Sequence, residues 1–192
     1  MNKLDLEKYL EAYIFSFKLH KKQIRKGSNI PYFTHLSSVS NLIIENNGTT
    51  TQAIAGLLHD AVEDQGGIKT LAAIKKKFGP KVAKIVGQCS DTSIDPKPPW
   101  KARKNKYIKD IKNKTQDTLL VILCDKYHNA HCILSDYQKI GDKIWDRFNA
   151  SKQETFWYYD SLYKEFKKYL KNHPELIKAY KNKVVEIKSI VT

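Results

Sequence analysis

Apolar residues recur along almost the whole chain at intervals of three and four residues, and this spacing constrains the fold more than any other feature. It places apolar side chains on one face of an α-helix, whereas the alternation typical of a β-strand is scarce. The first apolar stripe comprises Leu4, Leu6, Tyr9, Leu10, Tyr13, Ile14 and Phe17. Further helices are expected at about 36–45, 51–64, 68–78, 80–89, 101–113, 117–135, 152–171 and 174–190. The sequence therefore predicts an all-α fold, a compact bundle of several helices.

Glycine and proline separate the expected helices. Breaks fall at Gly48, Gly66–Gly67, Gly79–Pro80 and Pro174. The segment Ser90–Trp100 holds three of the six prolines, so we expect a surface loop there rather than a helix. A chain of 192 residues is long enough for one well-buried domain. We expect a single domain over 1–192, with its core at about 4–171 and a C-terminal helix at about 174–190.

Composition excludes several classes of protein. The longest apolar stretches, AIAGLL and LLVILC, are far too short to cross a bilayer, and acidic residues interrupt the N-terminal segment where a signal peptide would be apolar. Three cysteines without a CxxC pair suggest neither a disulfide framework nor a zinc ribbon, so we expect a cytoplasmic protein without a membrane partner. Taken alone, the net charge of +14 fits any anionic partner, whether nucleic acid, a membrane surface or a small polyphosphate, and does not choose among them.

Ionisable residues gather at the end of one apolar helical segment, AIAGLLHDAVED. His59 and Asp60 are adjacent there, and Glu63 and Asp64 follow one turn later. On a continuous helix these four side chains leave in one general direction. Burying so many charged groups requires compensation, and a divalent cation such as Mn²⁺, Fe²⁺, Zn²⁺ or Mg²⁺ would supply it. The pattern therefore favours a metal site.

Two further ligands are expected from distant segments. His35 follows the sequence PYFT where a new helix begins, and Asp125 directly follows the apolar run LLVILC. A buried helix would thus deliver the Asp125 carboxylate to the interior that the His59 segment faces. Taken singly, either residue has an ordinary structural interpretation, such as capping a helix or pairing with a lysine. The adjacent His59–Asp60 pair favours the metal site, because a structural core seldom keeps two such groups together.

The ordered pattern of His35, His59–Asp60 and Asp125 resembles the H…HD…D signature of HD-domain metal-dependent phosphohydrolases. It is similar above all to the hydrolase domains of Rel/SpoT-type enzymes and to the stand-alone small alarmone hydrolases. The matching stretches are HKKQIRKGSNIPYFTH (20–35), LLHDAVEDQGG (57–67), KKFGPKVAKIV (77–86) and LCDKYHNAHCIL (123–134), with weaker similarity in WKARKNKYI (100–108) and IWDRFNASKQETFWYY (144–159).

The resemblance implies a helical domain, a reaction and a set of site residues. It implies one Mn²⁺ ion and a (p)ppGpp 3′-pyrophosphohydrolase activity, in which a metal-activated water yields GDP or GTP and pyrophosphate. The implied metal ligands are His35, His59, Asp60 and Asp125. The implied catalytic pair is Glu63 and Asp64, either of which could accept or orient the proton of the attacking water. The implied nucleotide-binding residues are Arg25, Lys26, Tyr32 and Asn129.

Other interpretations stay open. The same scaffold could hydrolyse (p)ppApp, or remove phosphate from another nucleotide such as NADPH. A basic nucleic-acid-binding module is a third alternative, motivated by the net charge and by the segment Trp100–Lys114. It is less favoured because the positive charge is spread over many helices without a binding motif, and we expect a small anionic nucleotide as the partner instead. Some residues in the similar stretches stay outside the predicted site: His128, read as a packing or ligand-supporting residue, and Arg103, Lys104, Arg147 and Tyr158.

Overall fold

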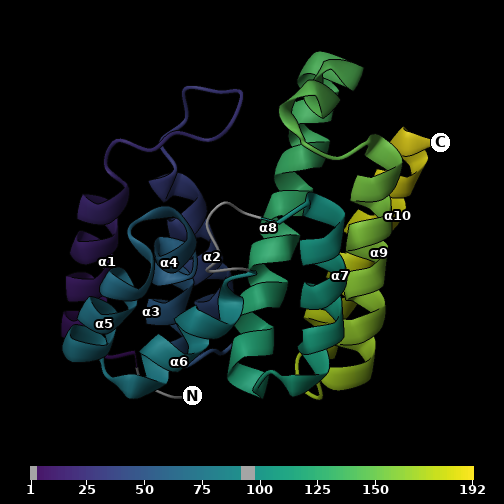
Figure 1. The fold of residues 1–192 in the computed structure, drawn as a ribbon. Coiled ribbons are helices and arrows are strands. Elements are labelled where there is room, and N and C mark those ends of the chain that lie inside the picture. Colours follow the sequence, from purple (N-terminus) through teal and green to yellow (C-terminus); the bar gives the residue numbers. More distant parts are fainter. Residues whose placement is uncertain (1–3, 92–97) are drawn as a thin grey trace.

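The computed structural model describes residues 4–91 and 98–192. Within these ranges the secondary structure is helical, without a β-strand and with one isolated bridge between Ile24 and Pro31. This confirms the predicted all-α fold. The helices (Figure 1) are α1 (Leu6–His20), α2 (Phe33–Glu45), α3 (Thr50–Leu58), α4 (Ala61–Asp64), α5 (Gly67–Phe78), α6 (Pro80–Cys89), α7 (Trp100–Asp110), α8 (Gln116–Ile140), α9 (Lys152–Tyr169) and α10 (Pro174–Val191), with 3₁₀ segments η1 (Ile111–Asn113) and η2 (Gly141–Arg147).

Helix α8 runs through the middle of the fold. Figure 1 shows α1–α6 together on one side of it and α7, α9 and α10 on the other. Helix α8 contacts α2, α3 and α6 on the first side and α9 and α10 on the second. Its residues 118–125 are all buried, since the run LLVILC is apolar on every face. This position carries Asp125 into the interior of the molecule.

Side-chain caps fix several helix starts. Thr49 and Gln52 form a reciprocal capping box at the start of α3, and Ser151 and Glu154 form another at the start of α9. The Thr115 hydroxyl accepts a hydrogen bond from the Thr118 backbone N–H at the start of α8. These local interactions account for the start positions predicted for α3, α8 and α9 to within a residue or two.

Some boundaries differ from the sequence prediction. The helix expected at 51–64 is divided at His59–Asp60 into α3 and α4. Helix α8 continues to Ile140, because the polar positions after 135 keep helical geometry until Gly141, whose φ of 58° breaks the helix. Trp100 belongs to α7 rather than to the predicted loop, of which residues 92–97 lie outside the described residues. The segment η2 was not predicted.

Buried apolar residues from α1 to α10 form one continuous cluster. The C-terminal helix contributes to this cluster through Leu176, Tyr180, Val184, Ile187 and Val191. Among the helices in residues 4–91 and 98–192, none has the length and apolar character needed to cross a membrane. The division into a single domain with a core at about 4–171 stays a prediction, although α10 packs as part of the same core.

Helix α1 is oriented differently from what its apolar stripe suggests. Its fully buried residues are Ala12, Ser16 and His20, which lie one turn apart along one face. Several large apolar residues of the stripe face solvent instead, namely Leu6, Leu10, Tyr13, Ile14 and Phe17. The helix is therefore apolar on two faces, of which only one packs against the core.

Gly56 allows α2 and α3 to pack closely together. A Cβ atom at this position would lie 2.5 Å from Ile43 Cδ1 and 3.2 Å from Ser40 Cα. We expect Gly56→Ala to lower the free energy of unfolding by about 1–3 kcal/mol, because the buried Ile43 side chain must shift and α2 must move slightly away from α3. Gly87→Ala is a matched control in α6, where the nearest atom is 3.6 Å away, and should leave stability unchanged or slightly raised. Urea unfolding of both variants checks this, and equal stabilities would contradict it.

Candidate active site

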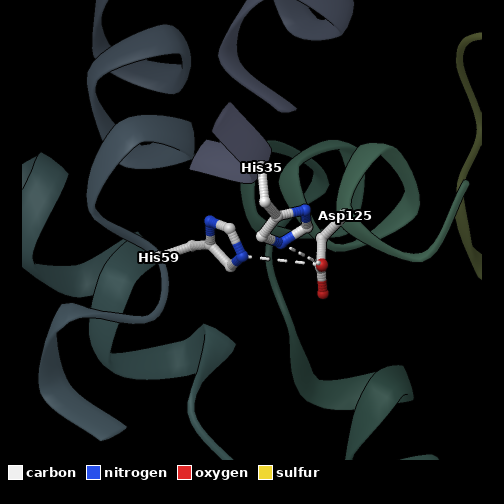
Figure 2. Close-up of side chains that lie close together, drawn as sticks. All are labelled: His35, His59 and Asp125. Carbon is white, nitrogen blue, oxygen red and sulfur yellow. Dashed lines mark ion pairs between the residues drawn. The ribbon is translucent and has the colours of Figure 1, made fainter. Parts of the chain in front are cut away.

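Three buried side chains from three helical segments meet at the centre of the fold. His35 lies in the first turn of α2, His59 directly follows α3, and Asp125 lies in α8. One donor atom from each lies within 4.8 Å of the other two. Figure 2 shows both imidazole rings directed at the Asp125 carboxylate. This is the spacing of ligands around one metal ion.

The interatomic distances bring Asp60 into the same cluster. Asp125 Oδ1 lies 3.2 Å from His35 Nε2 and 3.5 Å from His59 Nε2. Asp60 Oδ2 lies 3.0 Å from His59 Nε2 and 3.7 Å from His35 Nε2. All four side chains predicted as ligands therefore converge, although residues 35 and 125 are far apart in the sequence.

The imidazole rings are oriented by their other nitrogen atoms. His59 Nδ1 lies 2.8 Å from the Gly56 carbonyl oxygen, which can only accept a hydrogen bond. His59 Nδ1 therefore donates, so Nε2 faces the cluster and in the neutral ring presents its lone pair there. His35 Nδ1 lies 2.8 Å from His128 Nδ1, so a neutral His35 that donates there also presents its Nε2 lone pair. Within the described residues both buried Nε2 atoms make no hydrogen bond. Two lone pairs beside two carboxylates fit a divalent cation.

The two carboxyl groups of the cluster are held in their charged form by the basic groups beside them. Burial would raise the pKa of Asp125, but the Lys126 ammonium and His59 outweigh it and hold that pKa well below its usual range. Burial would likewise raise the pKa of Asp60, but the interaction with His59 outweighs it and lowers that pKa. Burial lowers the pKa of His35, whereas Asp60 and Asp125 overcome burial and raise the pKa of His59. Both carboxyl groups are thus ionised at neutral pH.

Three of the residues predicted to bind nucleotide also orient the Asp60 and Asp125 carboxylates, two of them directly and Arg25 through Asn129. The Tyr32 hydroxyl donates a hydrogen bond of 2.6 Å to Asp60 Oδ2. Asn129 Nδ2 donates to Asp125 Oδ1 over 2.5 Å, and Arg25 Nη2 donates to Asn129 Oδ1 over 2.9 Å. Such contacts fix the orientation of metal-binding carboxylates. The structure therefore places Arg25, Tyr32 and Asn129 directly around the cluster.

A cavity of about 530 Å³ adjoins the cluster. All four predicted nucleotide-binding residues line it, including Lys26, whose Nζ donates to Asn149 Oδ1 over 3.3 Å. The cationic side chains among the described lining residues are Arg25, Lys26, Lys104, Lys126, Lys139 and Arg147, and the acidic one is Asp136. The Asp136 carboxylate already pairs with Arg147 over 2.8 Å. The cavity therefore has the size of a small-molecule site and a positive lining.

The predicted catalytic pair, Glu63 and Asp64, lies in α4, immediately after the cluster residues His59 and Asp60. Glu63 is half-buried, and Asp64 is exposed and accepts a hydrogen bond of 2.8 Å from Gln23 Nε2. Because a turn at His59–Asp60 separates α3 from α4, although both residues keep right-handed helical φ and ψ, the four ionisable groups do not leave one continuous helix as expected. The turn instead gives His59 and Asp60 to the cluster and carries Glu63 and Asp64 onward on a separate short helix.

One residue beside the cluster, Lys126, was not predicted, and another, His128, has a contact that fits the ligand-supporting role expected of it. Lys126 Nζ lies 2.6 Å from Asp125 Oδ2, and His128 contacts His35. His128 follows Asp125 by three residues, so helical spacing could have placed it on the same face. Lys104 and Arg147, both outside the predicted site, line the cavity. No local pattern distinguishes these two residues from the many other surface cations of the chain.

Comparison with known proteins supports the same family. The family model described as an HD domain matches residues 12–156. A GTP pyrophosphokinase of Myxococcus xanthus is 30% identical over 135 residues, which are 67% of this chain and 17% of that relative. A protein of Aquifex aeolicus named guanosine-3′,5′-bis(diphosphate) 3′-pyrophosphohydrolase is 38% identical over 80 residues, 42% of this chain and 11% of the relative. The chain thus spans less than a fifth of the length of these two curated relatives.

A solved structure has a similar fold. It is described as a metazoan ortholog of SpoT that hydrolyses ppGpp, and it superposes with a TM-score of 0.76 at 21% identity, over 93% of this chain and 94% of that one. The resemblance to Rel/SpoT-type proteins that the motifs indicated is confirmed by these matches. Because the family model covers most of its length, the chain belongs to the HD-domain family.

Proposed function

We propose that this chain hydrolyses the 3′-pyrophosphate of (p)ppGpp, giving GDP or GTP and pyrophosphate. The observation that carries the proposal is the cluster of His35, His59, Asp60 and Asp125 beside a cavity lined by cations. The names of two similar proteins support the choice of substrate, since one is called a guanosine-3′,5′-bis(diphosphate) 3′-pyrophosphohydrolase and the other is said to hydrolyse ppGpp.

The four cluster residues would hold one divalent cation, which we propose to be Mn²⁺. When bound, the cation supplies Lewis acidity, which polarises phosphoryl oxygens and makes water more acidic. The protein keeps its ligands ready for this role. Gly56 and His128 orient the two imidazoles, while Tyr32 and Asn129 hold the two carboxylates. Little reorganisation of the side chains is then needed when the ion binds.

Cationic side chains would bind the phosphates. Arg25 offers a planar fork of N–H donors, and Lys26 offers a compact charge at the same wall of the cavity. Lys104 and Arg147 reach the cavity from α7 and η2. Trp100 is half-buried in the same lining, and a purine base could stack on its ring. The cavity therefore suits a small nucleotide with several phosphate groups.

A carboxylate would take up the proton of the attacking water. We assign this role to Glu63 or Asp64, which follow the cluster in α4. Asp64 is exposed and accepts a hydrogen bond from Gln23, and Glu63 is half-buried. Proton transfer of this kind contributes about 10²- to 10⁴-fold to the rate.

A three-substrate assay tests the proposal. The purified, Mn²⁺-loaded chain is incubated separately with ppGpp, ppApp and NADPH, and released pyrophosphate and phosphate are measured. We expect pyrophosphate from ppGpp. Pyrophosphate from ppApp alone, or phosphate from NADPH alone, would reassign the substrate, and no release of pyrophosphate from either alarmone would overturn the proposal.

Asn129 contacts both a residue predicted to bind nucleotide and a predicted metal ligand, and this leads to a separate prediction. Its side chain links Arg25 to Asp125, so we expect Asn129→Ala to lower kcat/KM for ppGpp by about 10- to 100-fold. The exposed Asn182 of α10 provides a control, and Asn182→Ala should retain full activity. Steady-state kinetics at saturating Mn²⁺ checks the prediction. An Asn129→Ala variant as active as the control would show that the link is dispensable.

A further inference from the structure

The outward face of α1 is an apolar surface that the described residues leave largely exposed. Leu6 is 68% exposed, Leu10 57%, Phe17 52%, Ile14 45% and Tyr13 38%. Their spacing of three and four residues places them in one stripe along the 15-residue helix, about 22 Å long. Figure 1 shows α1 at the outer edge of the molecule, away from α8. Large apolar residues gathered in this way mark an interaction surface.

The stripe is not needed to attach α1 to the fold. The opposite face already does so, with Ala12 and Ser16 fully buried. The Ser16 hydroxyl donates to the Leu57 carbonyl oxygen over 2.6 Å, and the Tyr9 and Ser40 hydroxyls lie 2.9 Å apart. Packing against the core accordingly buries one face of α1 and leaves the apolar residues of the other face largely exposed.

The stripe is held in shape at its inner border. The Phe33 ring of α2 meets the edge of Tyr13 at 4.7 Å and of Phe17 at 5.4 Å between ring centroids. These T-shaped contacts fix two members of the stripe without covering them. The surface is therefore already ordered before a partner binds, which lowers the entropic cost of association.

The charges beside the stripe match a second copy of the same helix. Glu7 and Lys18 are separated by about three helical turns and so lie on the same flank, Glu7 near the start of α1 and Lys18 near its end. In a two-fold arrangement the helices run antiparallel and equal flanks adjoin. Glu7 of each chain then lies beside Lys18 of the other, twice per dimer.

The local charge also favours a second copy over an anionic surface. The segment 5–19 carries three acidic residues and two lysines, whereas the whole chain carries +14. Two copies can thus approach through α1 without the repulsion expected between their other faces. A membrane or nucleic acid would instead meet the Glu7 carboxylate at the edge of the stripe, beside Glu11, which pairs with Lys77 over 3.4 Å. We propose that the chain forms a dimer by antiparallel pairing of α1 with α1 of a second copy.

Light scattering coupled to gel filtration tests the dimer. We expect a mass twice the 22.2 kDa of the chain, falling toward the monomer on dilution. Leu10→Asp should raise the dissociation constant by at least ~100-fold, because it places two carboxylates in the apolar contact. Val185→Asp is the matched control, since Val185 in α10 is also 57% exposed, and should stay dimeric. A wild-type monomer at every concentration, or equal effects of the two substitutions, would overturn the proposal.

Charge exchange tests the antiparallel arrangement. Glu7→Lys and Lys18→Glu should each raise the dissociation constant roughly tenfold, and the double variant should restore it, because the swapped charges again face each other. Failure of this rescue would reject the antiparallel pairing. Circular dichroism of each variant verifies that the fold is retained. Vesicles of phosphatidylcholine and phosphatidylglycerol provide the competing test, and a monomer that binds them through Leu10 would assign the surface to membranes instead.

Discussion

Asp60→Ala should abolish both metal binding and hydrolysis. The substitution removes an oxygen that lies 3.0 Å from His59 Nε2 and 3.7 Å from His35 Nε2, and it leaves the Tyr32 hydroxyl without its acceptor. We expect less than one tenth of the wild-type metal content after dialysis and a fall in kcat/KM of about 10³-fold or more, since several kcal/mol of transition-state stabilisation depend on the ion. Metal analysis of the purified variant and the pyrophosphate assay measure the two effects.

The control for this substitution is Asp160→Ala. Asp160 pairs with Lys164 over 2.7 Å on the surface of α9 and has a partly exposed side chain, as Asp60 has. It should retain both metal and activity. If Asp60→Ala bound metal as tightly as Asp160→Ala, Asp60 would not be a ligand, and the cluster would be reduced to His35, His59 and Asp125.

Glu63→Gln should separate catalysis from metal binding. The amide keeps the size of the side chain but cannot accept the proton of the attacking water at neutral pH. We expect wild-type metal content and a fall in kcat of about 10²- to 10⁴-fold, the usual contribution of a general base. Asp64→Asn should have the smaller effect if Glu63 is the base, because Asp64 is exposed and hydrogen-bonded to Gln23.

A matched substitution excludes a general effect of losing one negative charge. Glu186 pairs with Lys183 over 3.0 Å on α10, and Glu186→Gln should be fully active. A Glu63→Gln variant with full kcat would reject the proton-transfer role of Glu63. Loss of metal in that variant would mean that Glu63 acts on the ion rather than on the proton.

The residues at the centre of the site were predictable because they terminate apolar runs. LLVILC predicts a helix buried on all sides, and such a helix must carry its next residue, Asp125, into the interior. AIAGLL does the same for His59. In both segments the burial of the run determines the position of the polar residue that follows. Local sequence alone is sufficient for that inference.

Other parts of the site depend on contacts between residues far apart in the chain, and such contacts cannot be predicted from the local pattern of one sequence. Arg25 and Asn129 are 104 residues apart and meet only because the segment after α1 packs beside α8. The apolar stripe of α1 predicted a helix, but helical periodicity does not tell which of two apolar faces the core will select. The face that packs against the core is the one with the small residues Ala12 and Ser16, which allow closer packing than Leu10 or Phe17. The end of α3 at Leu58 was likewise not predictable, because no Gly or Pro follows within the next seven residues.

The two imidazoles of the cluster differ in their vulnerability to mutation. His59 is held by the Gly56 carbonyl oxygen, a main-chain atom that a substitution at position 56 can displace, through the tight packing of α2 and α3, but cannot remove. His35 is held by the side chain of His128, which a single nucleotide change in the gene can remove. Substitution of one residue, His128, thus removes the partner of the His35 ring outright, whereas the partner of the His59 ring is lost only if the main chain at Gly56 moves.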